Sequence, residues 1–294
     1  MSIEDIILDR DSRGVSKLRG HLPTNFCQEA AELILANPGT ALIATGFYIL
    51  ASSLPETDGP PGALAIGKAL ESLGYSVKYV SDLHTAPLLR ALTGNEAQVI
   101  DFPIADHAES EKYAGELLGE LAPSVVISIE RCGFTSQKQY LNMRGRDIGQ
   151  FNAKLDYLFT SHPNTVGIGD GGNEIGMGNL AEFIPGVGTL PDDPCATQVS
   201  KLILASVSNW GGYGLVAAIS LLKGWNLLPT VEEEQELVKR TVDIGAVDGI
   251  LTAPVYSVDG FPLEENSVAL VRLLELLRHE GVAFDKPSPF ATLP

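Results

Sequence analysis

The stretch Ser124-Val125-Val126-Ile127-Ser128-Ile129-Glu130 decides the fold of this chain. Its β-branched apolar run predicts a strand that is buried on both faces, as strands of a parallel sheet are. The carboxylate of Glu130 follows directly, and a buried carboxylate needs a cation, a metal ion or several donors beside it. Arg131 alternates to the other side of the chain, so it need not be that partner. Glu130 is therefore the first candidate site residue.

Similar apolar runs recur on both sides of this stretch, and helical patterns separate them. Strands are predicted at 41–44, 76–80, 98–102, 165–168 and 202–207, and helices at 63–73, 86–92, 107–121, 215–222, 231–244 and 267–279. Residues 1–40 also have a helical pattern, and 252–265 are irregular. Strands that alternate with helices imply right-handed βαβ units. We expect one α/β domain over residues 1–294, with a mainly parallel sheet flanked by helices in a doubly wound, Rossmann-like arrangement.

Composition narrows the class of protein. The 294 residues include 20 basic and 37 acidic ones, a net charge of −17 that disfavours nucleic-acid binding. The three cysteines are far apart, which argues against a disulfide framework and a structural zinc site. No apolar signal segment opens the chain and no apolar run reaches 18 residues, so we expect no membrane contact and a cytoplasmic location.

In open parallel sheets, ligands bind beyond the carboxyl ends of the strands. The strongest motif at such a place is Gly167-Ile168-Gly169-Asp170-Gly171-Gly172-Asn173-Glu174-Ile175-Gly176. It contains G-x-G-x-x-G, but the charges of Asp170 and Glu174 would repel a dinucleotide pyrophosphate. Carboxylates and an amide on a glycine-rich loop favour Mg²⁺ or Mn²⁺. The alternative interpretation is a tight turn with capping residues.

Three further segments could join this site. Glu56-Thr57-Asp58-Gly59 precedes a predicted helix, so its carboxylates either extend the acidic site or cap that helix. Arg144, in the segment 140–147, either binds an anionic substrate or forms a surface ion pair with Asp147. Residues 208–214 offer free N–H groups at a helix start for an anion, with Trp210 and Tyr213 either walling a pocket or packing in the core.

These motifs together resemble the D-glutamate cyclase C-terminal domain family, once described as a domain of unknown function. The matching segments are Gly167–Gly178, Ser128–Arg131, Tyr140-x-Asn142-x-Arg144, Glu56–Pro60 and Ser208–Tyr213, in family order. The resemblance implies a lyase activity, the reversible dehydration of D-glutamate to 5-oxo-D-proline, with a divalent metal (Mn²⁺ or Mg²⁺). The vertebrate enzyme also has an N-terminal hydro-lyase-like domain, which these residues do not include. Cys132-Gly133 departs from the Pro-Gly of the vertebrate pattern.

On this basis we assign provisional roles to the candidate residues. The catalytic set is Glu130, Glu174, Arg144 and Asn209, and the metal set is Glu56, Asp58, Glu130, Asp170 and Glu174. The substrate-binding set is Asn142, Asn173, Trp210, Gly211, Gly212 and Tyr213. We expect a small amino-acid-like substrate as the partner. The sequence leaves open whether the chain forms a homo-oligomer. The alternatives are a metal-dependent phosphatase or nucleotide hydrolase, and a non-catalytic small-molecule-binding subunit.

Overall fold

The computed structural model describes residues 1–290, and its central feature is a six-stranded parallel sheet. The strand predicted first is β6 (Val125–Ile129), which lies inside the sheet with all five residues buried. The strands are arranged in the order β5 (Val99–Asp101), β4 (Ser76–Ser81), β1 (Thr40–Thr45), β6, β7 (Thr165–Gly169) and β8 (Lys201–Leu204). This order, 3-2-1-4-5-6 along the chain, is that of the doubly wound Rossmann fold, as the sequence predicts.

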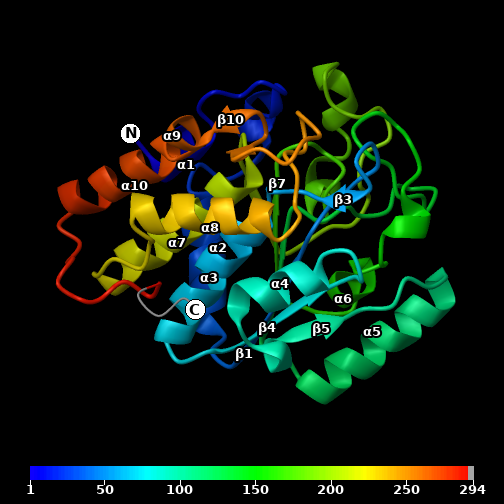
Figure 1. Ribbon diagram of the computed structural model, residues 1–294, viewed down its shortest axis with the longest axis horizontal. Coiled ribbons are helices and arrows are strands. Elements are labelled where there is room, and N and C mark those ends of the chain that lie inside the picture. Colours follow the sequence, from blue (N-terminus) through cyan, green and yellow to red (C-terminus); the bar gives the residue numbers. More distant parts are fainter. Residues whose placement is uncertain (291–294) are drawn as a thin grey trace.

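Helices cover the sheet in layers, as Figure 1 shows. One face carries α2 (Phe26–Ala36), α3 (Pro60–Ser72) and α7 (Ser208–Lys223), which pack against one another. Figure 1 places α5 (His107–Leu121) and α6 (Asp156–Thr160) on the other side of the strands. The remaining helices are α1 (Ile3–Ile7), α4 (Ala86–Thr93), α8 (Val231–Asp243), α9 (Leu263–Asn266) and α10 (Val268–His279). Within residues 1–290, no helix is both long and apolar enough to cross a membrane.

The glycine-rich segment after β8 differs from its prediction. The predicted strand over 202–207 already ends at Leu204, and the helix predicted over 215–222 already begins at Ser208, as α7. A Cβ on Gly211 would lie 2.5 Å from Ile168 Cγ2, and one on Gly212 would lie 3.0 Å from Ile129 Cδ1. These glycines therefore let α7 approach the sheet closely.

Two segments differ from their predictions: one predicted helical segment is interrupted, and one segment predicted to be irregular contains a hairpin. The helical pattern over 1–40 is divided into α1, a 3-10 helix over Val15–His21, and α2. The irregular stretch 252–265 contains a hairpin of β9 (Ser257–Val258) and β10 (Phe261–Pro262). Its turn is Asp259-Gly260, and both residues have positive φ angles, 51° and 80°. Such angles match the right-handed twist of paired strands, so Asp-Gly is a favoured hairpin turn. A second small hairpin joins β2 (Tyr48–Ile49) and β3 (Leu54–Pro55).

A buried polar network fastens the outer helices to α7. Glu234 of α8 accepts hydrogen bonds from Asn266 Nδ2 (2.5 Å) and Ser267 Oγ (2.7 Å). Asn266 Oδ1 in turn accepts from the indole N–H of Trp210 at 3.0 Å. Burial raises the pKa of Glu234 to about 7, although the hydrogen bonds from Ser267 and Asn266 oppose this shift. The network therefore holds a carboxyl group that ionises near neutral pH.

Glu234 should make folding stability depend on pH. Between its ordinary pKa of 4.5 and its folded pKa of about 7, the unfolded chain releases a proton that the folded chain retains. The contribution of this group to the free energy of unfolding should thus fall by about 3 kcal/mol across that window, at 1.36 kcal/mol per pKa unit. Urea unfolding of the wild type and Glu234→Gln between pH 4.5 and 8 measures this fall as the difference between their pH profiles.

The matched control is Glu236→Gln, an exposed carboxylate on the same helix. Its profile should follow that of the wild type. A Glu234→Gln profile parallel to the wild type would show that Glu234 does not titrate as described.

Candidate functional site

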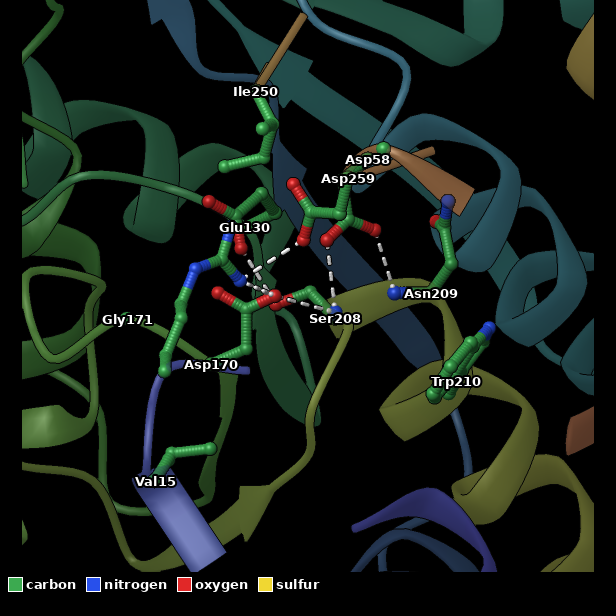
Figure 2. A network of polar contacts seen from close by, with 12 residues as sticks. Val15, Asp58, Glu130, Asp170, Gly171, Ser208, Asn209, Trp210, Ile250 and Asp259 are labelled. Atoms are coloured by element: carbon green, nitrogen blue, oxygen red, sulfur yellow. Dashed lines mark hydrogen bonds and ion pairs between the residues drawn. The ribbon is translucent and has the colours of Figure 1, made fainter. Parts of the chain in front are cut away.

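The candidate site lies where the strand order reverses. The chain proceeds from β1 to β4 on one side and from β6 to β7 on the other, so a crevice opens at the carboxyl ends of β1 and β6. Glu130 follows β6 and Asp170 follows β7, while the chain after β1 returns through the β2–β3 hairpin to Asp58. Figure 2 shows Asp58, Glu130, Asp170 and Asp259 facing one another in this crevice.

Glu130 occupies an uncommon backbone conformation. Its φ of 45° lies in the left-handed region, which non-glycine residues rarely adopt and which often marks functional sites. Ser208 Oγ donates to Glu130 Oε2 at 2.6 Å. Arg131 points elsewhere, as its alternation predicted, and donates to Asp82 Oδ2 (2.6 Å) and the Gly46 carbonyl (2.9 Å). Arg131 therefore joins the ends of neighbouring strands and leaves Glu130 free to face the crevice.

The loop after β7 closes on its own carboxylate. The N–H groups of Gly171 and Gly172 each donate to one oxygen of Glu174, both at 2.7 Å. Gly172 has a φ of 98°, which a glycine tolerates without strain. The turn and the acidic site, which the sequence left as alternatives, therefore occur together. The side chains of Glu130, Asp170 and Glu174 place carboxylate oxygens within 4.8 Å of one another.

The N-terminus of α7 binds carboxylates of the protein itself. Ser208 N–H donates to Asp58 Oδ2 (2.8 Å) and Asp170 Oδ2 (3.0 Å), and Asn209 N–H donates to Asp58 Oδ1 at 2.7 Å. Figure 2 shows both contacts of Asp58 with the start of this helix. Free N–H groups at a helix start favour anions, and here Asp58 satisfies them. The anion site predicted at this position is thus occupied by the Asp58 carboxylate of the protein itself.

Two residues of the site escaped sequence analysis. Arg13 Nη1 lies 2.7 Å from Asp170 Oδ2 and 2.9 Å from Asp259 Oδ2. Asp259 also forms a second close group with Asp58 and Asp170, again within 4.8 Å. The Asp259-Gly260 pair was a signal for a hairpin turn, although nothing in it indicated a site. Arg13 lies in the polar start of the segment 1–40, which was predicted to be helical, and nothing there indicated a site.

Burial and mutual repulsion change the acidity of this cluster. Burial raises the pKa of Glu56, Asp58 and Glu130 well above its ordinary value, and neighbouring carboxylates add to the effect. Burial likewise raises the pKa of Asp170 to about 6 and of Asp259 to about 7, against the opposing charge of Arg13. Arg13 is the cation that pairs with the cluster in residues 1–290. Arg13 therefore provides one positive charge for five buried carboxyl groups, which is too little to keep all of them ionised.

A cavity of about 350 Å³ opens over these carboxylates, within the usual range of small-molecule sites. Its buried part is lined by Glu56, Glu130, Asp170, Asn173, Glu174 and Asp259. Arg144 and Arg146 line its exposed rim, and neither forms an ion pair with Asp147, whose Oδ1 accepts from Gly149 N–H. Asn142 also lines the rim. Its Oδ1 shapes the turn by accepting the backbone N–H groups of both arginines.

The remaining predicted residues lie away from the cavity. Asn209 Oδ1 accepts the N–H groups of Gly59 and Gly62, which ties the start of α3 to α7. The other four are buried in the packing of α7 and do not line the cavity: Trp210, Gly211, Gly212 and Tyr213. Trp210 contacts Asn266 of α9, whereas Gly211 and Gly212 lie against the sheet and α3. The catalytic role of Asn209 and the substrate-binding role of the other four residues therefore stay predictions from the sequence.

The donor chemistry of the cavity fits a hard divalent cation. Mg²⁺ and Mn²⁺ prefer carboxylate and carbonyl oxygens, which dominate its buried part. Two further oxygens there, Glu56 Oε1 and Asn173 Oδ1, are buried and find no hydrogen-bond partner in the described part of the chain. A buried acceptor without a partner is costly, so these atoms are suited to a ligand.

Comparison with known proteins shows the family of this chain. The chain is 26% identical over 312 aligned residues to the mitochondrial D-glutamate cyclase of Homo sapiens, a match that covers 91% of this chain and 50% of that protein. The chain thus spans about half the length of the curated relative it matches. The family described as "D-glutamate cyclase-like, C-terminal" matches residues 3–275, nearly the whole chain. The chain therefore belongs to the D-glutamate cyclase-like C-terminal family.

Proposed function

We propose that this chain is a D-glutamate cyclase-like hydro-lyase that interconverts D-glutamate and 5-oxo-D-proline with a divalent cation, Mn²⁺ or Mg²⁺. The observation that supports it is the acidic cavity at the switch point of the sheet, in a chain of this family. Its substrate would be a small dicarboxylic amino acid, which matches the cavity in size and in the distribution of charge along its wall.

The reaction sets clear demands on the site. The substrate amine attacks the γ-carboxyl carbon, a C–N bond forms, and one γ-oxygen leaves as water. The amine must first lose a proton, and both ends of the substrate must be held in a bent conformer. Holding reacting groups in contact removes much of the entropic barrier. A bound divalent cation supplies Lewis-acid polarisation of the γ-carboxyl group.

The residues of the cavity can meet these demands. Arg144 at the exposed rim can pair with the α-carboxylate, since its guanidinium has no carboxylate partner within residues 1–290. Asn173 Oδ1, buried and without a partner, can accept a hydrogen bond from the amine. Glu130 or Glu174 can take the amine proton. Burial and the neighbouring carboxylates raise the pKa of Glu130, which favours proton uptake by this group while no cation is bound.

Glu56, Glu130, Asp170 and Glu174 would hold the cation, because their carboxylates line one cavity. Asp58 does not line the cavity, and its oxygens accept N–H groups at the start of α7, so we assign it to positioning that helix. The same contacts weaken the alternative of a phosphatase or nucleotide hydrolase, because the helix N-terminus that would bind phosphate is filled.

One observation favours a second candidate function, a binding subunit. The curated relative is about twice as long as the matched region, so part of its chemistry could reside in its other half. Metal and substrate binding without turnover, with turnover restored by a separate hydro-lyase-like protein, would support this alternative.

The first test is product formation. The purified chain should convert D-glutamate to 5-oxoproline with Mn²⁺ or Mg²⁺ and lose the activity with a chelator. The Asp170→Asn/Glu174→Gln double variant should lower kcat by roughly 10²–10³-fold, the usual loss for removing groups that stabilise a transition state. Chromatographic measurement of 5-oxoproline from D- and L-glutamate checks this, with exposed Glu182→Gln as the matched control. Normal product from the double variant would sink the proposal.

The second test concerns recognition of the α-carboxylate. Arg144→Gln should raise KM for D-glutamate by roughly 10–100-fold, because a hydrogen-bonded charge pair contributes about 1.5–3 kcal/mol. Initial rates over a range of substrate concentrations separate KM from kcat. Lys112→Gln, a cation exposed on α5, should leave both constants unchanged. An unaltered KM in Arg144→Gln would place the α-carboxylate elsewhere.

A further inference from the structure

The cluster contains two groups of three carboxylates that share Asp170. The Asp259 group consists of Asp58, Asp170 and Asp259, and the Glu174 group consists of Glu130, Asp170 and Glu174. Adjacent groups that share a carboxylate are how proteins hold two metal ions side by side. We infer that Arg13 takes the place of the second ion, so that the site holds one divalent cation, bound by the Glu174 group. This inference rests on the metal dependence of the proposed function.

The Asp259 group is already neutralised by the protein. Arg13 Nη1 contacts both Asp170 Oδ2 (2.7 Å) and Asp259 Oδ2 (2.9 Å). The third member, Asp58, receives N–H groups on both oxygens, from Ser208 on one and from Asn209 on the other. A metal ion here would have to displace a guanidinium, which stays protonated at any ordinary pH.

Arg13 is held in place by its own turn. The Asp11 carboxylate accepts N–H groups from Arg13 (3.1 Å), Gly14 (2.7 Å), Val15 (3.1 Å) and Ser16 (2.8 Å). Only 18% of the Arg13 side chain is exposed. The guanidinium is therefore a fixed positive charge at the bottom of the cavity, and not a surface side chain that happens to reach the carboxylates.

In the Glu174 group only Asp170, which it shares with the Asp259 group, contacts Arg13. Glu174 accepts two backbone N–H groups and Glu130 accepts one hydroxyl, and neither forms an ion pair with a lysine or arginine in the described chain. Glu56, which is 5% exposed, lines the same cavity, and its Oε1 atom has no hydrogen-bond partner there. This buried oxygen belongs to neither group, and a cation bound in the cavity would give it a partner.

Manganese stoichiometry tests the inference directly, without substrate. Isothermal titration of the full chain with Mn²⁺ should give one ion per chain for the wild type and two for Arg13→Met, which removes the charge and keeps much of the bulk. Arg13→Lys is the matched control and should retain one ion. Electron paramagnetic resonance should show isolated Mn²⁺ in the wild type and a spin-coupled pair in Arg13→Met.

Two further variants locate the ion and do not depend on whether Arg13→Met folds. Glu174→Gln should weaken Mn²⁺ binding to the wild-type site by at least about tenfold, as expected for the loss of a metal contact. Asp259→Asn should change it less than about threefold. Two ions in the wild type, no gain in a folded Arg13→Met, or a stronger loss in Asp259→Asn than in Glu174→Gln would each overturn the inference.

The result is separable from that of the proposed function, because no step of this experiment measures turnover. A chain that binds one Mn²⁺, gains a second in Arg13→Met and makes no 5-oxoproline would uphold the inference and defeat the cyclase proposal. A chain that makes 5-oxoproline and binds two Mn²⁺ ions in the wild type would uphold the cyclase proposal and defeat the inference.

Discussion

Carboxylates cannot stay ionised side by side in a protein interior unless positive charge or N–H donors compensate them. This constraint governs the crevice between β1 and β6, where Glu130, Asp170 and Glu174 converge. The protein answers it with three devices: the N–H groups at the start of α7, the N–H groups of Gly171 and Gly172, and the guanidinium of Arg13. The carboxylates that these donors and this charge do not fully compensate make the site suited to a cation.

The rest of the fold brings these N–H donors and the guanidinium together at the crevice. Gly211 and Gly212 let α7 lie close to the sheet, which brings Ser208 within hydrogen-bonding distance of Asp58, Asp170 and Glu130. The ion pair of Arg131 with Asp82 joins the segments that follow β6 and β4, the strands on either side of β1. The outer helices, fastened through Glu234 and Trp210, hold α7 from behind. Residues distant from the cavity thus contribute by fixing the helix whose N-terminus orders it.

Division of labour within the cavity follows from burial. Its deep part is acidic and enclosed, which favours a cation and raises the pKa of Glu56 and Glu130. Its rim carries Arg144 and Arg146, which are exposed and remain available to an anion from solution. A substrate with an amine and two carboxylates has complementary charges for both parts. The opposite signs of floor and rim would orient such a molecule as it enters.

The sequence by itself determined the parallel α/β fold, because β-branched runs such as 124–129 and their alternation with helices depend on local pattern. It also placed Glu130, Asp170 and Glu174 together, since residues that follow parallel strands share one edge of the sheet. It placed the start of α7 too late, at 215 and not at Ser208, because glycines disfavour a helix unless a tertiary contact, here with the sheet, requires them. Only the tertiary structure brought in Arg13 and Asp259, which lie 246 positions apart and meet through long-range packing that no local pattern encodes.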